Sequence, residues 1–180
     1  YKDLSKINPS LIYASITPFG QTGPRKAFEG TELTTLATGG LTFESGLPDH
    51  PPCTAPAYMS YDFAGIYAAA GITVCLIERG LSGEGQHIDL SIQEAVAATT
   101  DIMIPAYDNE GLELTRNGFT NTRLEPAGLY KCQDGWVCFM PLRPTQWDAM
   151  VEWMDNPELL QDPMFLDMMK RSENSDILKP

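Results

Sequence analysis

Short apolar runs and longer helical patterns follow one another along the first part of the chain. The run LIYASI at 11–16 is short and apolar, which predicts a buried strand. The run HIDLSI at 87–92 alternates polar and apolar residues, which predicts a half-buried strand. Helices are expected at 31–41, 60–80 and 93–104. Strands that alternate with helices predict an α/β fold.

The segment 60–80 is apolar on nearly every face, with Asp62 as a lone carboxylate near its start. Ser60 is a favoured residue for capping the beginning of a helix, and Gly80 suits the position just after its last turn. A helix that is apolar all round is a buried one, so this segment is expected to be the central helix. No uninterrupted apolar run reaches the ~18 residues that span a bilayer, so no membrane span is expected.

The pattern changes after residue 105. Residues 106–125 lose their periodicity and gain Asn, Gly and charge, which is typical of a linker. Beyond the linker, two short runs at 128–132 and 136–140, joined through Asp134-Gly135, predict a β-hairpin.

The last part of the chain begins with apolar residues spaced three and four apart at 144–154, which predicts a helix. The tail 155–180 is polar. We therefore expect a first domain at 1–105 and a second at 126–180, on either side of the linker.

The charge of the chain narrows the classes of ligand. The net charge is −12, from 24 acidic and 12 basic residues, and the Lys and Arg residues form no stripe. A nucleic-acid surface needs a basic patch, so no nucleic-acid partner is expected. The chain opens without Met and without an apolar leader, which fits a piece of a longer protein.

The four cysteines make no CxxC pair, and neither histidine lies near one at ligand spacing. No metal site is therefore expected. This cysteine pattern favours a reducing compartment over a disulfide framework, so a cytoplasmic location is expected.

Four motifs occur in one order along the chain: INPSLIYASITPFGQTGP, ATGGLTFESGLPDHPP, ERGLSGEGQHIDLSIQEA and AGLYKCQDGWVCF. Together they resemble the class III CoA-transferase family, which includes formyl-CoA transferase, carnitine CoA-transferases and α-methylacyl-CoA racemase. The resemblance implies the second part of a Rossmann-like, parallel-sheet large domain that binds coenzyme A, followed by the start of a small α+β domain with an antiparallel hairpin. It also implies a chain about twice this long and an interlocked homodimer.

The resemblance assigns chemistry to Asp62. Transferases of the family use one Asp as a nucleophile, which attacks an acyl-CoA thioester and forms a mixed anhydride before a small carboxylic acid is exchanged in. Asp62 is the one carboxylate between Asp49 and Glu78, and a helix N-terminus favours its ionised form. Glu32 matches an acidic residue that the family keeps near its active site. The simpler interpretation of Asp62 is an acidic residue that stabilises the first turn of a helix.

The register leaves a second possibility open. Counting forward from Glu32, or back from Gly71, puts the family's nucleophile at Tyr61, one residue before Asp62. One residue on a helix is a rotation of about 100° and a rise of about 1.5 Å. Either compensating length changes restore Asp62 to the nucleophile position, or Tyr61 holds it and the chain is a non-catalytic CoA-binding or assembly homologue.

An acyl-CoA racemase or isomerase is a further alternative. Racemases of the family carry a His just before the acidic residue, and the residue here is Thr31. Proton abstraction next to a thioester needs two acid/base groups, and threonine cannot serve as one.

The expected contacts with coenzyme A lie after the first strand and at the start of the long helix. Gln21 follows a strand at the end where open α/β sheets bind ligands. Residues 28–31 match a family stretch that touches coenzyme A, and a Lys beside them suits a phosphate. The expected set is Gln21, Lys26, Phe28, Glu29, Gly30, Thr31 and Tyr61. A plain strand-to-helix turn and a solvated loop are the alternatives for these residues.

Overall fold

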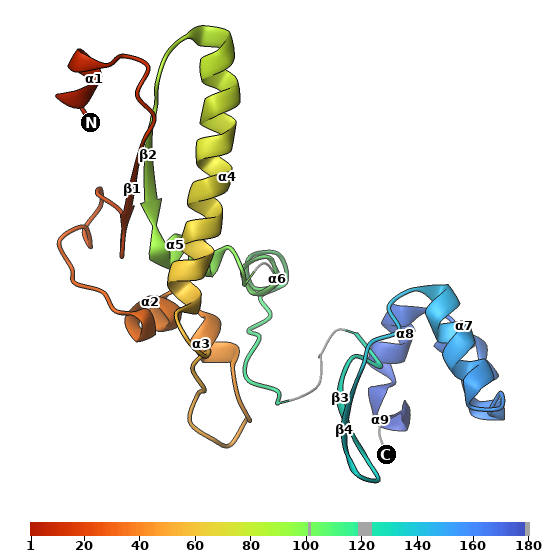
Figure 1. Ribbon diagram of the computed structural model, residues 1–180. Coiled ribbons are helices and arrows are strands. Elements are labelled where there is room, and N and C mark those ends of the chain that lie inside the picture. The colour runs from red at the N-terminus through yellow and green to blue at the C-terminus, as the bar shows by residue number, and fades with distance from the viewer. Residues whose placement is uncertain (101, 119–123, 179–180) are drawn as a thin grey trace. The chain divides into compact units, whose positions relative to one another are not determined.

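The computed structural model describes residues 1–100, 102–118 and 124–178 and divides the chain into two compact units (Figure 1). One unit comprises Tyr1–Gly46 and His50–Arg116, and the other comprises Leu47–Asp49 and Asn117–Pro180. The first contains a parallel pair of strands and the second an antiparallel pair. The α/β class expected from the sequence is thus confirmed.

The parallel sheet of the first unit consists of β1 (Tyr13–Thr17) and β2 (His87–Ser91). Their register runs from Tyr13 opposite His87 to Thr17 opposite Ser91. Both strands lie where the sequence predicts them, and β2 is half-buried as expected. The prediction of a buried β1 is wrong: Tyr13 and Ile16 are exposed, because among the described residues β1 pairs with β2 alone. The helices of this unit are α1 (Leu4–Ile7), α2 (Glu32–Thr38), α3 (Leu41–Glu44), α4 (Met59–Ser82), α5 (Ile92–Ala97) and α6 (Met103–Glu110).

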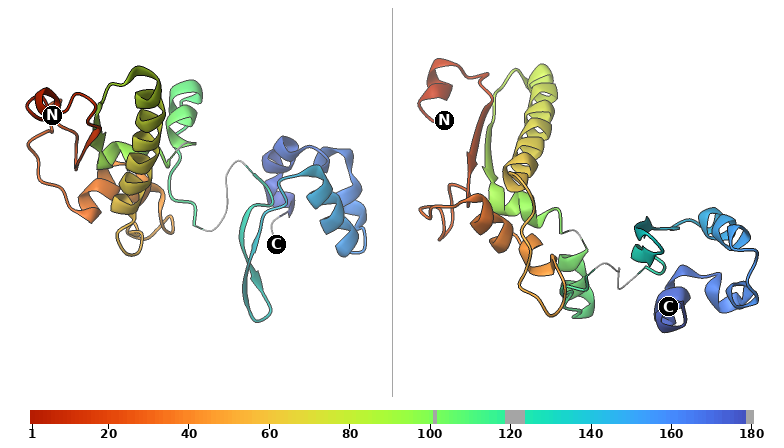
Figure 2. Two further views of the ribbon diagram at one scale, coloured as in Figure 1. Left: turned by 45° about the horizontal axis from the view of Figure 1, so that its top comes forward. Right: turned by 60° about the horizontal axis from the view of Figure 1, so that its bottom comes forward.

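The long helix α4 runs beside the sheet, as both views in Figure 2 show, and packs against β1, β2, α2 and α5. It begins after Tyr58 and ends at Gly83, whose φ of 79° is readily adopted by glycine. The predicted caps are therefore wrong: Gly80 lies inside the helix and Ser60 lies inside its first turn. Ser60 is not the cap because its hydrogen bonds go to a residue of α2, described below.

One side of α4 is covered and the other is exposed, which corrects the expectation of a helix buried all round. Ser60, Ala64, Ala68 and Cys75 are buried, whereas Ile66 is 66% exposed. By length and composition alone α4 is apolar enough to cross a membrane, although no uninterrupted apolar run in it reaches ~18 residues. Asp62 and Glu78 end its longest apolar run, and the helix stays apolar on average because it carries few charged residues. The core helix of a soluble protein passes the same test.

The predicted helix at 93–104 is two helices. The hydroxyls of Thr99 and Thr100 donate to the carbonyls of Val96 and Ala97, and such local bonds compete with helix continuation. Pro105 does not end α6 but lies in its first turn, where the missing N–H costs no helical hydrogen bond. α6 thus occupies the start of the expected linker 106–125, of which residues 119–123 lie outside the described residues.

The second unit opens with the predicted hairpin, made of β3 (Gly128–Cys132) and β4 (Gly135–Phe139). Its turn is Gln133-Asp134 instead of Asp134-Gly135, because Gly135 pairs with Cys132. The predicted helix follows as α7 (Pro144–Trp153). The polar tail then folds into η1 (Glu158–Gln161), η2 (Pro163–Phe165), α8 (Met168–Glu173) and α9 (Ser175–Leu178).

The core of this unit joins α7 to the tail. It consists of Trp147, Met150, Val151, Leu160 and Phe165. The Arg171 guanidinium lies 4.1 Å from the centre of the Trp147 ring and donates to the carbonyls of Phe165 and Glu125. The Tyr130 hydroxyl donates to the Glu125 carboxylate at 2.7 Å, and burial together with this carboxylate raises the pKa of Tyr130 well above its ordinary value.

Candidate active site

The N-terminus of α2 is tied to the N-terminus of α4 through one carboxylate. Glu32 is the first residue of α2, directly after the capping residue Thr31. Its Oε1 accepts a hydrogen bond from the Ser60 backbone N–H at 2.9 Å, and its Oε2 accepts one from the Ser60 hydroxyl at 2.6 Å. Thr35, one turn further along α2, places its hydroxyl 2.9 Å from the Ser60 hydroxyl.

Asp62 lies in the same first turn of α4 as Ser60 but on another side of the helix. Two residues of helix correspond to a rotation of about 200°, so its side chain departs from α4 away from Glu32. It is exposed, and its backbone N–H donates to the Tyr58 carbonyl at 3.0 Å. Among the described residues no hydrogen bond joins the side chains of Asp62 and Glu32. The structure therefore brings Glu32 together with Ser60 and leaves Asp62 facing solvent.

Tyr61 occupies the intermediate position on the helix, about 100° from Ser60. Its side chain is 40% exposed, and its ring centre lies 6.2 Å from that of Tyr58. Tyr61 is thus closer in angle to the Glu32 side of α4 than Asp62 is.

The loop after β1 is anchored by residues at the start of α5 and in β2. The backbone N–H of Gln21 donates to both oxygens of the Asp89 carboxylate, at 3.2 and 3.0 Å. The Gln93 N–H donates to the Pro18 carbonyl at 3.0 Å. Gly20 and Gly23 have φ values of 79° and 75°, which turn the loop around this anchor. The start of the loop is thus tied to α5 and β2 at Pro18 and Gln21, and the side chains of residues 21–29 are exposed.

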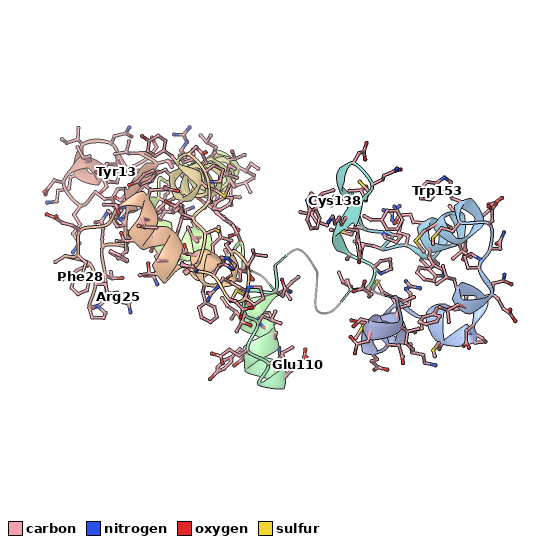
Figure 3. The ribbon with its side chains drawn as sticks, turned by 90° about the horizontal axis from the view of Figure 1, so that it is seen from below. Tyr13, Arg25, Phe28, Glu110, Cys138 and Trp153 are labelled. Carbon is pink, nitrogen blue, oxygen red and sulfur yellow. The ribbon has the colours of Figure 1, made fainter. Side chains whose placement is uncertain are left out.

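The other predicted contact residues follow in the same loop. Phe28 is 60% exposed and meets Phe19 edge to face, with ring centres 6.3 Å apart. Figure 3 shows Phe28 and Arg25 extending from the loop, and Lys26 and Glu29 are also exposed. A Cβ at Gly30 would collide with the Pro18 ring, so the approach of the two segments requires glycine there.

Sequence reasoning missed Ser60, Thr35 and Asp89 as parts of this site. The sequence predicts that Ser60 caps its own helix, whereas its N–H and hydroxyl donate to Glu32 of α2. Thr35 and Asp89 carry no local signal, because their partners lie 25 and 68 residues away. Among the described residues, no three His, Cys, Asp or Glu side chains gather as metal ligands would.

The sequence of the chain is similar to that of a known protein family. The sequence model of CoA-transferase family III matches residues 1–180. The chain belongs to this family. The resemblance found in the four sequence motifs is thereby confirmed.

Two similar relatives are named as CoA-transferases. The chain is 33% identical over 175 residues to succinyl-CoA–D-citramalate CoA-transferase of Chloroflexus aurantiacus, covering 97% of this chain and 44% of the relative. It is 31% identical over 180 residues to acetyl-CoA:oxalate CoA-transferase of Acetobacter aceti, covering 99% of this chain and 46% of the relative. The chain thus spans less than half the length of these relatives.

Solved structures show the same fold. A CaiB/BaiF family protein from Brucella suis matches with a TM-score of 0.73 at 28% identity, over 99% of this chain and 47% of that one. Rv3272 from Mycobacterium tuberculosis matches with a TM-score of 0.80 at 22% identity, over 99% and 47% of the two chains.

Proposed function

We propose that this protein transfers coenzyme A between an acyl-CoA thioester and a small carboxylic acid, with Asp62 as the nucleophile. The observation that carries the proposal is the hydrogen-bonded junction of Glu32 with the first turn of α4, the turn to which Asp62 belongs. Relatives named for CoA transfer to oxalate or from succinyl-CoA support the reaction class.

The proposed reaction is covalent catalysis in balanced steps. The Asp62 carboxylate attacks the thioester carbonyl carbon, and the C–S bond breaks. CoA thiolate departs, and an acyl-aspartyl anhydride remains on the enzyme. The thiolate then attacks the aspartyl carbonyl, which releases the acyl group as a carboxylate and leaves an aspartyl-CoA thioester. The acceptor carboxylate then attacks the aspartyl-CoA thioester and displaces CoA thiolate, which gives a second anhydride. The thiolate attacks the acceptor's carbonyl carbon in this anhydride, which forms the new acyl-CoA and frees Asp62.

Glu32 assists in this proposal by holding the turn, since both of its carboxylate oxygens are occupied by Ser60. The coenzyme A contacts are assigned to the anchored loop and its neighbours: Gln21, Lys26, Phe28, Glu29, Gly30, Thr31 and Tyr61. The exposed cation and ring of Lys26 and Phe28 suit the phosphates and the base of the nucleotide. We assign 1–105 to the large domain and 126–180 to the small one, in a cytoplasmic homodimer.

A second candidate is a non-catalytic subunit that binds coenzyme A. It is favoured by the helix geometry, in which Tyr61 lies nearer in angle to Glu32 than Asp62 does. One relative, 31% identical over 170 residues, is named as subunit BbsE of a succinyl-CoA:(R)-benzylsuccinate CoA-transferase of Thauera aromatica. A racemase gains no support, because Thr31 caps α2 with its side chain.

Trapping the anhydride tests the proposal. The full-length protein is incubated with succinyl-CoA or acetyl-CoA and hydroxylamine, and its peptides are analysed by mass spectrometry. We expect CoA transfer to a panel of dicarboxylic acids and a hydroxamate on Asp62. Binding of CoA without transfer and without a hydroxamate would instead establish the non-catalytic candidate.

Replacing Asp89 with Ala removes the acceptor for the Gln21 N–H. A hydrogen bond to a charged group contributes about 1.5–3 kcal/mol, so we expect the KM for the CoA thioester to rise about ten- to a hundredfold while kcat changes little. Steady-state kinetics at saturating acceptor acid measure both constants. The control is Glu84→Gln, an exposed carboxylate in the turn before β2. A fall in kcat at unchanged KM would place Asp89 outside coenzyme A binding.

A further inference from the structure

The hydroxyls of Thr35 and Ser60 form a buried extension of the Glu32 junction. Both residues are fully buried, and they belong to different helices. The chain of hydrogen bonds runs from the Thr35 hydroxyl to the Ser60 hydroxyl at 2.9 Å, and from there to Glu32 Oε2 at 2.6 Å.

The direction of these bonds follows from which groups carry a proton to donate. An ionised carboxylate only accepts, so the Ser60 N–H and the Ser60 O–H both donate to Glu32. The one hydroxyl proton of Ser60 is then used, and its oxygen can only accept from Thr35. The alternative acceptors of the Thr35 hydroxyl are the Thr31 and Glu32 carbonyls of its own helix. When the Thr35 hydroxyl donates to Ser60, the buried Ser60 oxygen receives a hydrogen bond from the protein.

This network replaces a cap that α4 does not provide for itself. The N-cap residue Tyr58 makes no side-chain capping bond. The free N–H groups at a helix start need acceptors, and Glu32 supplies one from α2 at the Ser60 N–H. Contacts with α2 therefore set the rotation of the first turn about the axis of α4 and its position along that axis. They set the positions of Tyr61 and Asp62 in the same way. A shift of the turn by one residue would rotate a side chain by about 100°.

We propose that Thr35 is a positioning residue for CoA transfer: by orienting the Ser60 hydroxyl toward Glu32, it holds the turn that presents Asp62 to the thioester. This inference rests on the proposed function. Among the described residues the Thr35 side chain has hydrogen bonds to Thr31, Glu32 and Ser60 and none to Asp62, so it acts through Ser60 and the backbone of α4.

Two substitutions in the full-length protein separate the hydroxyl from the methyl group of Thr35. Thr35→Val keeps the volume and removes the hydroxyl, whereas Thr35→Ser keeps the hydroxyl and removes the methyl group. One hydrogen bond corresponds to about a five- to tenfold effect, so we expect Thr35→Val to lower kcat by that factor with KM unchanged. Thr35→Ser is expected to retain the wild-type kcat.

Hydrogen exchange of the amides at 60–63, followed by mass spectrometry, gives a readout that does not need activity. We expect exchange to speed up in Thr35→Val and to stay slow in Thr35→Ser. The control is Thr38→Val, which removes a hydroxyl that donates only to the Thr34 carbonyl of the same helix. Thermal unfolding of all variants identifies any loss of the fold.

The outcomes are distinct. Loss of kcat in both Thr35 variants in proportion to lost thermal stability, or unchanged kcat and exchange in Thr35→Val, would overturn the positioning role. A wild-type protein without transferase activity would refute the proposed function and the positioning role with it, and the exchange data would then still decide whether the hydroxyl of Thr35 holds the first turn of α4.

Discussion

Replacing Asp62 with Asn is expected to lower kcat for CoA transfer at least about a thousandfold. The amide keeps the size of the carboxylate but is a very poor nucleophile, so the acyl-aspartyl anhydride cannot form. Binding of the thioester is expected to stay near the wild-type level, because the predicted coenzyme A contacts lie mainly in the loop anchored by Asp89. Turnover of succinyl-CoA with an acceptor acid, and the affinity for CoA by calorimetry, measure the two quantities.

Two variants on the same helix serve as controls for Asp62→Asn. Glu78→Gln removes the other carboxylate of α4, four turns away, and is expected to leave kcat unchanged. Tyr61→Phe keeps the ring and removes the hydroxyl, and kcat is expected to change by no more than a few fold. Wild-type activity in Asp62→Asn would refute the nucleophile, and a loss confined to Tyr61→Phe would move the chemistry to the neighbouring residue.

The strands and the long helix could be predicted from the sequence because their signals are local. β1 and β2 are short apolar or alternating runs, one bounded by Pro18 and the other preceded by a glycine-rich turn. The sequence misplaces the start of α4 because its first turn is stabilised by Glu32, which lies 28 residues from Ser60. Periodicity within a segment carries no information about such a partner.

The candidate site could likewise be predicted only in part. Glu32 and Asp62 could be picked out as carboxylates in the expected places, and the structure joins Glu32 to the turn that carries Asp62. The orientation of Asp62 could not be predicted, since a single residue of register rotates it by about 100°. The sequence also could not show which side of α4 is covered. Apolar residues lie all around the helix, and the buried side is the one that carries Ala64 and Ala68.

The folded tail of the second unit could not be predicted because its apolar residues come in short clusters without a regular period. Leu160 and Phe165 lie in the short apolar clusters LL at 159–160 and MFL at 164–166, which follow no helical or alternating period. In the structure both are buried against α7, in the core around Trp147. Short turns starting at Pro157 and Pro163 place them there, and the Arg171 guanidinium donates to the Phe165 carbonyl.

Replacing Phe165 with Ala is expected to lower the free energy of unfolding of the second unit by about 3–5 kcal/mol. The side chain is fully buried, and its removal leaves a cavity beside Trp147 and Met150. A domain of ordinary stability has about 5–15 kcal/mol in total, so much of the unit's stability depends on this one residue of the tail. Urea unfolding followed by tryptophan fluorescence isolates the effect, because Trp136, Trp147 and Trp153 all belong to the second unit.

Leu166→Ala is the matched control for Phe165→Ala, since Leu166 is the next residue and is 61% exposed. A surface substitution of this kind changes stability by about 0.5 kcal/mol or less. Equal effects of the two variants would show that the tail does not pack against α7 as the structure has it. A large loss in Phe165→Ala alone would show that the tail is part of the core of the second unit, because only a buried side chain leaves a cavity when it is removed.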